Sequence, residues 1–120
     1  MLVQERASFR HAFAGLRHAW KTQRHLRIHA VLGAIAGGAA ILLRLSPGEW
    51  AVLLLTIALV FALEMLNTVV EVVVDMISPD YHPQAKVAKD VAAGAVLITA
   101  LGAVAVGVAI FLPRLAVLLR

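Results

Sequence analysis

The chain contains 120 residues, 62% of them hydrophobic and only 15% charged, and it carries a formal net charge of +4 with no cysteine. Soluble domains have roughly 45–50% apolar and about 25% charged residues, so this composition excludes both an intrinsically disordered chain and an ordinary soluble enzyme. The absence of cysteine excludes disulfides and thiol nucleophiles, and residues 1–120 are expected to form one membrane domain.

Residues 8–27 are predicted to form an amphipathic helix. At about 100° per residue, the aromatic and aliphatic side chains of this segment gather on one side, whereas arginine, lysine and histidine fill the other. This pattern is typical of a helix that lies in the membrane interface. Six of the eleven basic residues precede the first long apolar segment, which favours anionic lipid headgroups over nucleic acid as their partner.

A first membrane-spanning helix is predicted over residues 28–45, where charged or histidine side chains occur only near the ends. The turn that follows combines three signals for the start of the next helix. Ser46 is a good N-cap, Pro47 suits the first helical position, and Glu49 can complete a capping box. Because this connection is short, the first two spans are expected to be antiparallel neighbours.

Two further spans are predicted over residues 49–77 and 83–112. Prolines and small polar residues mark a short loop between them, and His82 is interpreted as a cap of the last helix. The last span holds an uncharged run long enough to cross a hydrocarbon core of about 30 Å. Pro113 and Arg114 are expected to end it.

The distribution of lysine and arginine predicts the orientation of these helices. The N-terminal flank and the 78–90 segment hold eight basic residues, whereas the 44–49 turn and the C-terminus hold three. Since basic residues are enriched in cytoplasmic segments, the N-terminus is predicted to be cytoplasmic and the C-terminus outside. The predicted fold is an all-α, multi-pass membrane protein with one interfacial helix and three transmembrane helices.

A polar stripe made of Glu64, Asn67, Glu71 and Asp75 interrupts the second span. The helical period places these four residues within roughly 80° on one face. Glu64 lies about 21 Å along the axis from Trp50, so it is expected to remain inside the membrane, where ionisable groups usually mark function. Asp75 lies near the boundary, where simple solvation is an alternative explanation for its carboxylate.

The depth of these groups indicates a reaction at the membrane surface. A lipid substrate would meet the desolvated Glu64 at one end and carboxylates suited to Mg²⁺ at the other. Lys86, Lys89 and Asp90 open the next helix in the same layer. Carboxylates, an amide and lysines fit the transfer of a phosphoryl group from a metal nucleotide to a lipid alcohol.

The sequence EMLNTVVEVVVD at residues 64–75, followed by HPQAKVAKDVAAGAV at residues 82–96, resembles the signature of the small prokaryotic lipid kinases. These are the integral-membrane diacylglycerol kinases and undecaprenol kinases. The resemblance covers nearly the whole chain and implies a homotrimer of three-span subunits in the bacterial cytoplasmic (inner) membrane. It also implies ATP with Mg²⁺ as the phosphate donor and active sites shared between neighbouring subunits.

The resemblance implies roles for the polar stripe. Glu64 is similar to the general base that takes the proton of the lipid hydroxyl, and Asn67 to a partner that orients the substrate or the base. Both are therefore expected to contact the lipid. Glu71 is similar to a magnesium ligand that bridges the ATP phosphates.

Further nucleotide-binding residues are implied around the same membrane boundary. Asp75 falls near the nucleotide, while Lys89 and Asp90 resemble residues that contact its phosphates and its adenosine portion. Arg10 and Arg17 are candidates for additional ATP-phosphate or headgroup contacts. Their alternative interpretation as ordinary interfacial cations is at least as good.

Gln23 departs from the family pattern, in which a glutamate that helps to hold metal is common at this position. Its side-chain oxygen can still bind a metal but brings no charge, so a second metal site is either absent or receives its charge elsewhere. His25 and His29 have the spacing of a zinc pair, four residues apart, but no evident third ligand. His11, His18 and His25 recur every seven residues on the basic side, where protonation or solvation explains them more simply.

Three classes of function compete at this point. A lipid kinase is favoured. Undecaprenol is the expected acceptor and diacylglycerol the alternative, because the sequence of residues 82–96 is more similar to that of undecaprenol kinases. A proton-conducting subunit would use Glu64 but would leave Glu71, Asp75 and Lys89 without roles. A pore former or scaffold would require no alignment of polar groups.

Overall fold

The computed structural model describes residues 1–120, which form four helices and no strand. α1 (Leu2–Thr22) precedes three helices that are each long and apolar enough to cross a membrane, namely α2 (Arg24–Leu42), α3 (Pro47–Ile77) and α4 (Pro83–Leu118). This confirms the prediction of an all-α membrane protein in which an N-terminal helix is followed by three spans.

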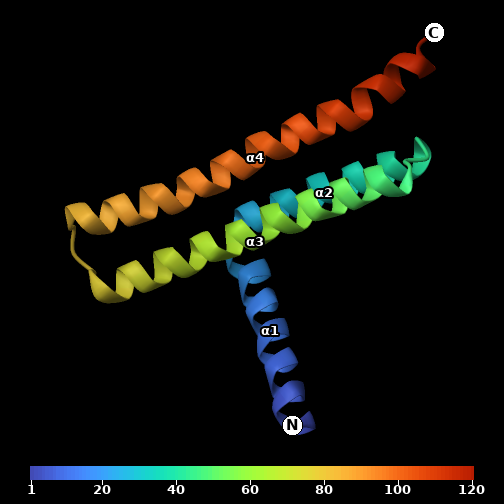
Figure 1. Ribbon diagram of the computed structural model, residues 1–120. Helices are drawn as coiled ribbons and strands as arrows, with labels where there is room; N and C mark the ends of the chain where they lie inside the picture. Colours follow the sequence, from blue (N-terminus) through green and yellow to red (C-terminus); the bar gives the residue numbers. More distant parts are fainter.

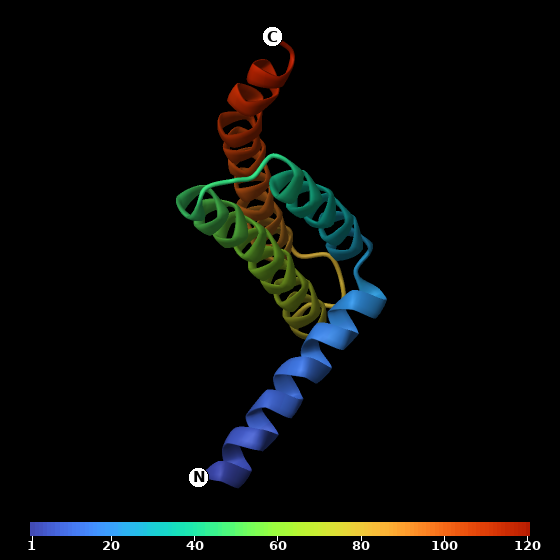
Figure 2. The same ribbon diagram turned by 90° about the vertical axis from the view of Figure 1, so that its right-hand side faces the viewer.

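The three long helices form a bundle from which α1 diverges (Figure 1, Figure 2). α3 and α4 are antiparallel and make the most extensive helix–helix contact, whereas α2 packs beside α3 over a shorter length. The tight turn after α2 makes α2 and α3 antiparallel neighbours, as predicted. α3 therefore extends well beyond the start of α2, toward its loop with α4.

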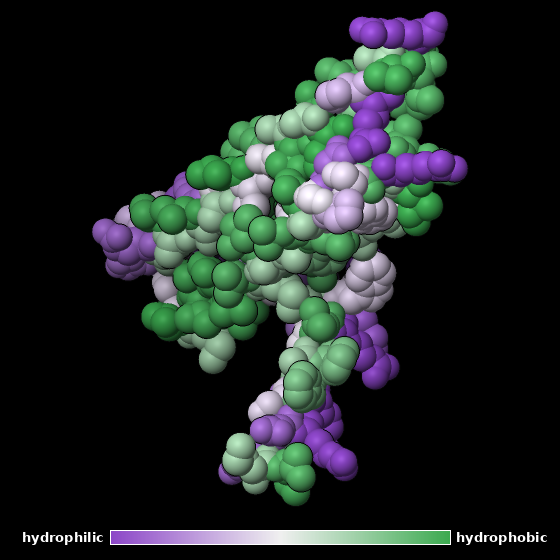
Figure 3. All heavy atoms as spheres, turned by 45° about the vertical axis from the view of Figure 1, so that its right-hand side comes forward, coloured by the Kyte–Doolittle hydropathy of each residue, from purple (hydrophilic) through white to green (hydrophobic).

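Few side chains are buried within the chain. Only 9 of 120 residues are buried, and a small core of Ala40, Leu45, Leu53 and Ile110 joins the three long helices near the α2–α3 turn. Hydrophobic side chains cover the body of the bundle, and hydrophilic ones gather at its ends and along α1 (Figure 3). Such a surface needs lipid or further protein around it.

The N-terminal helix differs in its bounds from the one predicted over residues 8–27. α1 begins near the N-terminus and ends at Thr22, and the backbone of Gln23 is extended, with φ −105° and ψ 104°. α2 begins at the next residue, so the first span starts earlier than the predicted 28–45 and ends at Leu42. The break separates the basic amphipathic helix from the apolar one.

Arg27 explains how this break is stabilised. From the first turn of α2, its Nη1 donates to the backbone carbonyls of Trp20 (2.8 Å) and Lys21 (3.1 Å). Carbonyls in the last turn of a helix lack helical partners, so the side chain satisfies two acceptors at the end of α1. The two acceptors lie seven and six residues before Arg27, on the other side of a change in chain direction. Helical periodicity therefore does not predict these hydrogen bonds.

The start of α3 confirms the predicted capping box. Ser46 Oγ accepts the backbone N–H of Glu49 at 3.3 Å, and Glu49 Oε1 accepts the backbone N–H of Ser46 at 3.1 Å. Pro47 occupies the first turn, where its missing N–H costs no hydrogen bond. Both hydrogen bonds and the position of Pro47 are local features, so the sequence was sufficient to predict them.

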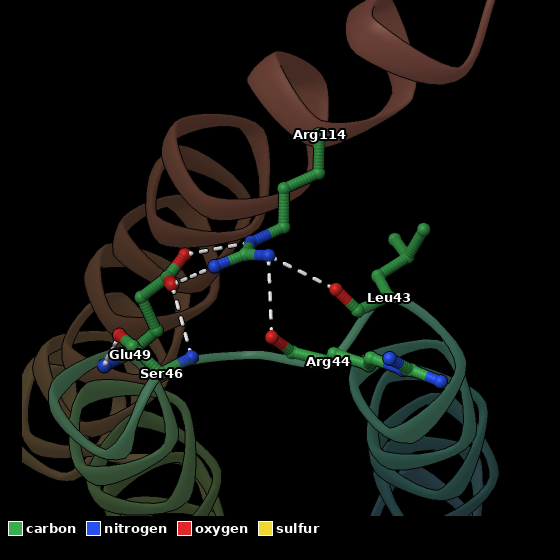
Figure 4. Close-up of polar contacts among 5 residues, drawn as sticks. All are labelled: Leu43, Arg44, Ser46, Glu49 and Arg114. Carbon is green, nitrogen blue, oxygen red and sulfur yellow. Dashed lines mark hydrogen bonds and ion pairs between the residues drawn. The ribbon is translucent and has the colours of Figure 1, made fainter.

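The sequence predicted that the last span ends at Pro113 and Arg114. This is wrong, because α4 continues beyond them to Leu118. Proline removes one helical hydrogen bond and crowds the preceding turn, which is why it favours a helix end. Here the next residue ties α4 to the α2–α3 turn and so supports the helix across the proline (Figure 4). The Arg114 guanidinium donates to both carboxylate oxygens of Glu49 and to the carbonyls of Leu43 (2.9 Å) and Arg44 (3.3 Å).

Replacing Arg114 by methionine is expected to lower the thermal unfolding temperature in detergent by a few degrees. The change removes the donors for two backbone carbonyls and leaves the Glu49 carboxylate without its cation. A thermal-shift assay measures the effect. Arg120→Met is the matched control because Arg120 is exposed at the C-terminus. Equal unfolding temperatures for the two variants would contradict this role of Arg114.

Candidate active site

The polar stripe of α3 passes from a buried to an exposed environment. Glu64 is 5% exposed, whereas Glu71 and Asp75 are exposed. At 1.5 Å per residue, about 16 Å separates Glu64 from Asp75 along the helix axis. The candidate site therefore has a desolvated end, where α2 packs against α3, and a solvated end at the α3–α4 loop.

Glu64 lies against α2 and has a histidine as its ionisable neighbour. Nε2 of His29 is 3.9 Å from Oε2 of Glu64, and the two side chains are 20% and 6% exposed. The backbone carbonyl of Glu64 accepts the hydroxyl of Thr68 at 3.2 Å. A carboxylate in the middle of a spanning helix is costly, which makes Glu64 a candidate for a chemical role.

Asn67 and Glu71 lie one helical turn apart and are bonded to each other. Asn67 Nδ2 donates to Glu71 Oε1 at 3.2 Å. Asn67 Oδ1 is buried and has no hydrogen-bond partner. Buried acceptors are nearly always satisfied in folded proteins, so this oxygen marks a place where a bound molecule or water can donate.

A polar pocket of about 380 Å³ lies at the α3–α4 loop. Lys89 of α4 forms an ion pair with Asp75 of α3, and Lys86 pairs with Asp90 at 2.6 Å. All four of these side chains line the pocket, so the structure brings together three residues that the sequence associated with the nucleotide. The other lining residues are Val74, Ser78, Pro79, Asp80, Tyr81, His82 and Ala85.

His82 caps α4, as predicted. Its Nδ1 accepts the backbone N–H of Gln84 at 3.1 Å, and Pro83 occupies the first turn. The cap ends the short α3–α4 loop and directs the first turns of α4 toward α3. This local geometry brings Lys89 within reach of Asp75.

Three of the predicted site residues, Arg10, Arg17 and Gln23, are not bonded to the others. Arg10 and Arg17 are on α1, which diverges from the bundle, and neither forms an ion pair or side-chain hydrogen bond within the chain. Gln23 lies at the break between α1 and α2. No side-chain hydrogen bond or ion pair within the chain joins these three residues to the polar stripe.

Glu71 is the best candidate in the chain for holding a metal ion. Its side chain is exposed, and its Oε2 accepts no hydrogen bond. No three His, Asp or Glu side chains converge within the chain. Mg²⁺ needs no such cage, because it usually keeps several waters and is held by one or two carboxylates together with substrate phosphates. The exposed carboxylate fits that mode of binding.

Sequence reasoning missed the pairing of His29 with Glu64. Spacing along one helix pairs His29 only with His25, whereas the structure places His29 against Glu64 of another helix. One sequence signal was available, because His29 is the polar residue deepest into the start of an apolar span. Which residue it faces depends on how α2 packs, and spacing within one helix does not reveal that.

Comparisons with known proteins identify a family to which this chain is similar. Residues 10–111 match the family model described as prokaryotic diacylglycerol kinase. A Synechocystis sp. (strain ATCC 27184 / PCC 6803 / Kazusa) protein named diacylglycerol kinase is 51% identical over 90% of this chain, which spans only 62% of that relative's length. An undecaprenol kinase from Bacillus subtilis (strain 168) is 42% identical over 90% of this chain and 88% of its own length. The diacylglycerol kinase of Escherichia coli (strain K12) is 34% identical over 78% of this chain and 77% of its own.

Proposed function

The chain belongs to the prokaryotic diacylglycerol kinase family of membrane lipid kinases, and we propose that it transfers the γ-phosphate of ATP to the hydroxyl of undecaprenol. The observation that carries this proposal is the polar stripe, which leads from buried Glu64 to a charged pocket about 16 Å away at the end of α3. A lipid alcohol is largely apolar and a nucleotide is charged, so their polarities match those of the two ends of the stripe. The stripe can therefore hold the two substrates from opposite ends.

Glu64 acts as the general base in this proposal. The oxygen of the lipid hydroxyl forms a bond to the γ-phosphorus while its proton passes to the Glu64 carboxylate. The bond between that phosphorus and the bridging oxygen breaks, and ADP leaves. The burial of Glu64 supports this role because bulk water is kept from the carboxylate and from the transferred phosphoryl group.

Asn67 orients the acceptor. Its buried Oδ1 lacks a donor in the chain, whereas its Nδ2 is held by Glu71. A lipid hydroxyl that donates to Oδ1 would lie about one helical turn from Glu71, the carboxylate that faces the phosphates. Transfer of a phosphoryl group depends mainly on such positioning and on charge neutralisation.

Mg²⁺ is the metal that the site would use. Glu71 would hold it together with the ATP phosphates, and Gln23 would contribute an uncharged oxygen. The bound ion supplies positive charge that offsets the charge on the phosphates during transfer. Asp75, Lys89 and Asp90 bind the nucleotide, with Lys89 pairing to phosphate and the carboxylates facing the sugar and base.

A homotrimer would complete the site. Few residues are buried in one chain, and α1 extends away from the bundle (Figure 2). Arg10, Arg17 and Gln23 would then meet the polar stripe of a neighbouring subunit, or contact anionic lipid headgroups through α1. With the N-terminus cytoplasmic and the C-terminus outside, the pocket at the α3–α4 loop faces the cytoplasm and its ATP.

An acceptor panel tests the proposed substrate. Purified protein with radiolabelled ATP and Mg²⁺ is expected to phosphorylate undecaprenol at a higher kcat/KM than diacylglycerol or a short-chain alcohol. The B. subtilis relative, aligned along most of its length, supports this order. The higher identity of the Synechocystis relative favours diacylglycerol as the second candidate. Preferential phosphorylation of diacylglycerol would replace the proposed acceptor and leave the kinase chemistry unchanged.

A further inference from the structure

The carboxylate of Glu64 has a single basic neighbour. His29 is the only lysine, arginine or histidine with a side-chain nitrogen within 4.0 Å of it. The contact joins two helices, because His29 is on α2 and Glu64 is on α3. Both side chains are largely withdrawn from solvent. Water therefore does little to orient this carboxylate, and His29 is the group best placed to do so.

The surroundings of His29 are apolar. It lines a cavity of about 270 Å³ between α2, α3 and α4, to which α4 contributes only uncharged side chains such as Ala100, Ala103 and Val104. In an environment of this kind, a hydrogen bond to a carboxylate is stronger than in water, and an unpaired carboxylate is costly. No other charged group competes with Glu64 for the imidazole.

The distance is consistent with a contact that tightens when substrate binds. At 3.9 Å, Nε2 lies beyond the range of a hydrogen bond, which for N–H···O is about 2.7–3.2 Å. Catalytic hydrogen bonds are often long in the absence of substrate, and a small rotation of either side chain closes this gap. The base in a catalytic constellation is commonly oriented by a third group in this manner.

We propose that His29 is a positioning residue for Glu64. Its Nε2–H holds Oε2, so that Oε1 is directed to the hydroxyl of the lipid and receives its proton. His29 itself touches neither substrate nor nucleotide and acts through Glu64. The proposal rests on the lipid kinase function proposed above and adds a residue from α2 beside the polar stripe of α3.

The test compares three variants at this position with a matched control. His29→Leu and His29→Met are expected to lower kcat by about 10- to 100-fold with little change in KM for ATP, because the base is misdirected while the nucleotide pocket is intact. His29→Gln is expected to stay within about threefold of wild type, because its amide N–H lies close to the position of Nε2–H. His25→Leu, an exposed histidine one turn earlier on α2, should keep the wild-type rate.

A second measurement separates positioning from folding. If His29 acts only through the base, adding His29→Leu to Glu64→Gln should cause no further loss of rate, whereas independent effects would multiply. Three results would overturn the role of His29. The effects of the two changes could multiply, His29→Leu and His29→Met could keep the wild-type kcat, or His29→Gln could lose as much activity as they do.

These outcomes distinguish the inference from the function on which it rests. A wild-type protein that phosphorylates undecaprenol or diacylglycerol but is insensitive to His29 would refute only the positioning role. A wild-type protein that transfers no phosphate from ATP to either lipid would overturn both proposals.

Discussion

Replacing Glu64 by glutamine is expected to lower kcat for lipid phosphorylation by roughly 10²- to 10⁴-fold, the usual contribution of a general base. Glutamine has nearly the same size and shape as glutamate, so the packing of α3 against α2 is retained. Its amide cannot accept the proton of the lipid hydroxyl. Because the nucleotide pocket lies about 16 Å away along α3, binding of ATP is expected to be unchanged.

Radiolabelled phosphate transfer in mixed micelles measures this effect, and a fluorescent ATP analogue measures nucleotide binding. Glu5→Gln is the matched control, because Glu5 is exposed in the first turn of α1 and forms no ion pair in the chain. A wild-type rate in Glu64→Gln would refute the general-base role. Loss of ATP binding together with turnover would also refute it, since Glu64 would then support the fold and not the proton transfer.

The parts of the fold that the sequence predicted correctly depend on neighbours within a few residues. The capping box joins Ser46 to Glu49, and His82 caps the helix that begins one residue later. Both follow from local backbone geometry and from the donors that a helix start leaves free. The three spans follow from composition alone, because long apolar helices satisfy their own backbone in a membrane.

The errors arise where a side chain from another helix decides the local structure. Pro113 is compatible with the helix because Arg114 binds Glu49, which is 65 residues away in sequence. The helix predicted over 8–27 breaks at Gln23, where Arg27 satisfies carbonyls of the preceding helix. Neither partner can be identified from helical periodicity, since the choice depends on how helices meet in space.

The candidate site was also predictable where it depends on spacing along one helix or on a short loop. Spacing on one helix predicted that Glu64, Asn67, Glu71 and Asp75 share a face, and the bond between Asn67 and Glu71 agrees with that. The short α3–α4 loop explains why Lys89 reaches Asp75. The contact of His29 with Glu64 required the packing of α2, and Arg10 and Arg17 form no ion pair within the chain.

The second large effect is expected at Glu71. Replacing Glu71 by glutamine should lower kcat/KM for ATP by about 100-fold at a fixed, moderate Mg²⁺ concentration, comparable to the loss of one electrostatic group that stabilises a transition state. Glutamine keeps an oxygen that can accept from Asn67 Nδ2, so the hydrogen bond within the stripe persists. The change therefore removes the negative charge and little else, and charge is what attracts a hard divalent cation.

Titration with Mg²⁺ distinguishes a metal ligand from a residue that contacts only the lipid. If Glu71 helps to hold the ion, the Glu71→Gln variant should need more Mg²⁺ for half-maximal activity and should recover part of its rate at high Mg²⁺, while KM for the lipid stays constant. The Glu5→Gln control should follow the wild-type titration. An unchanged Mg²⁺ requirement together with a raised KM for the lipid would move Glu71 from the nucleotide side of the stripe to the acceptor side. Because Gln23 brings no charge, Glu71 would supply most of the negative charge that holds the metal, and the shift in Mg²⁺ requirement should be correspondingly large.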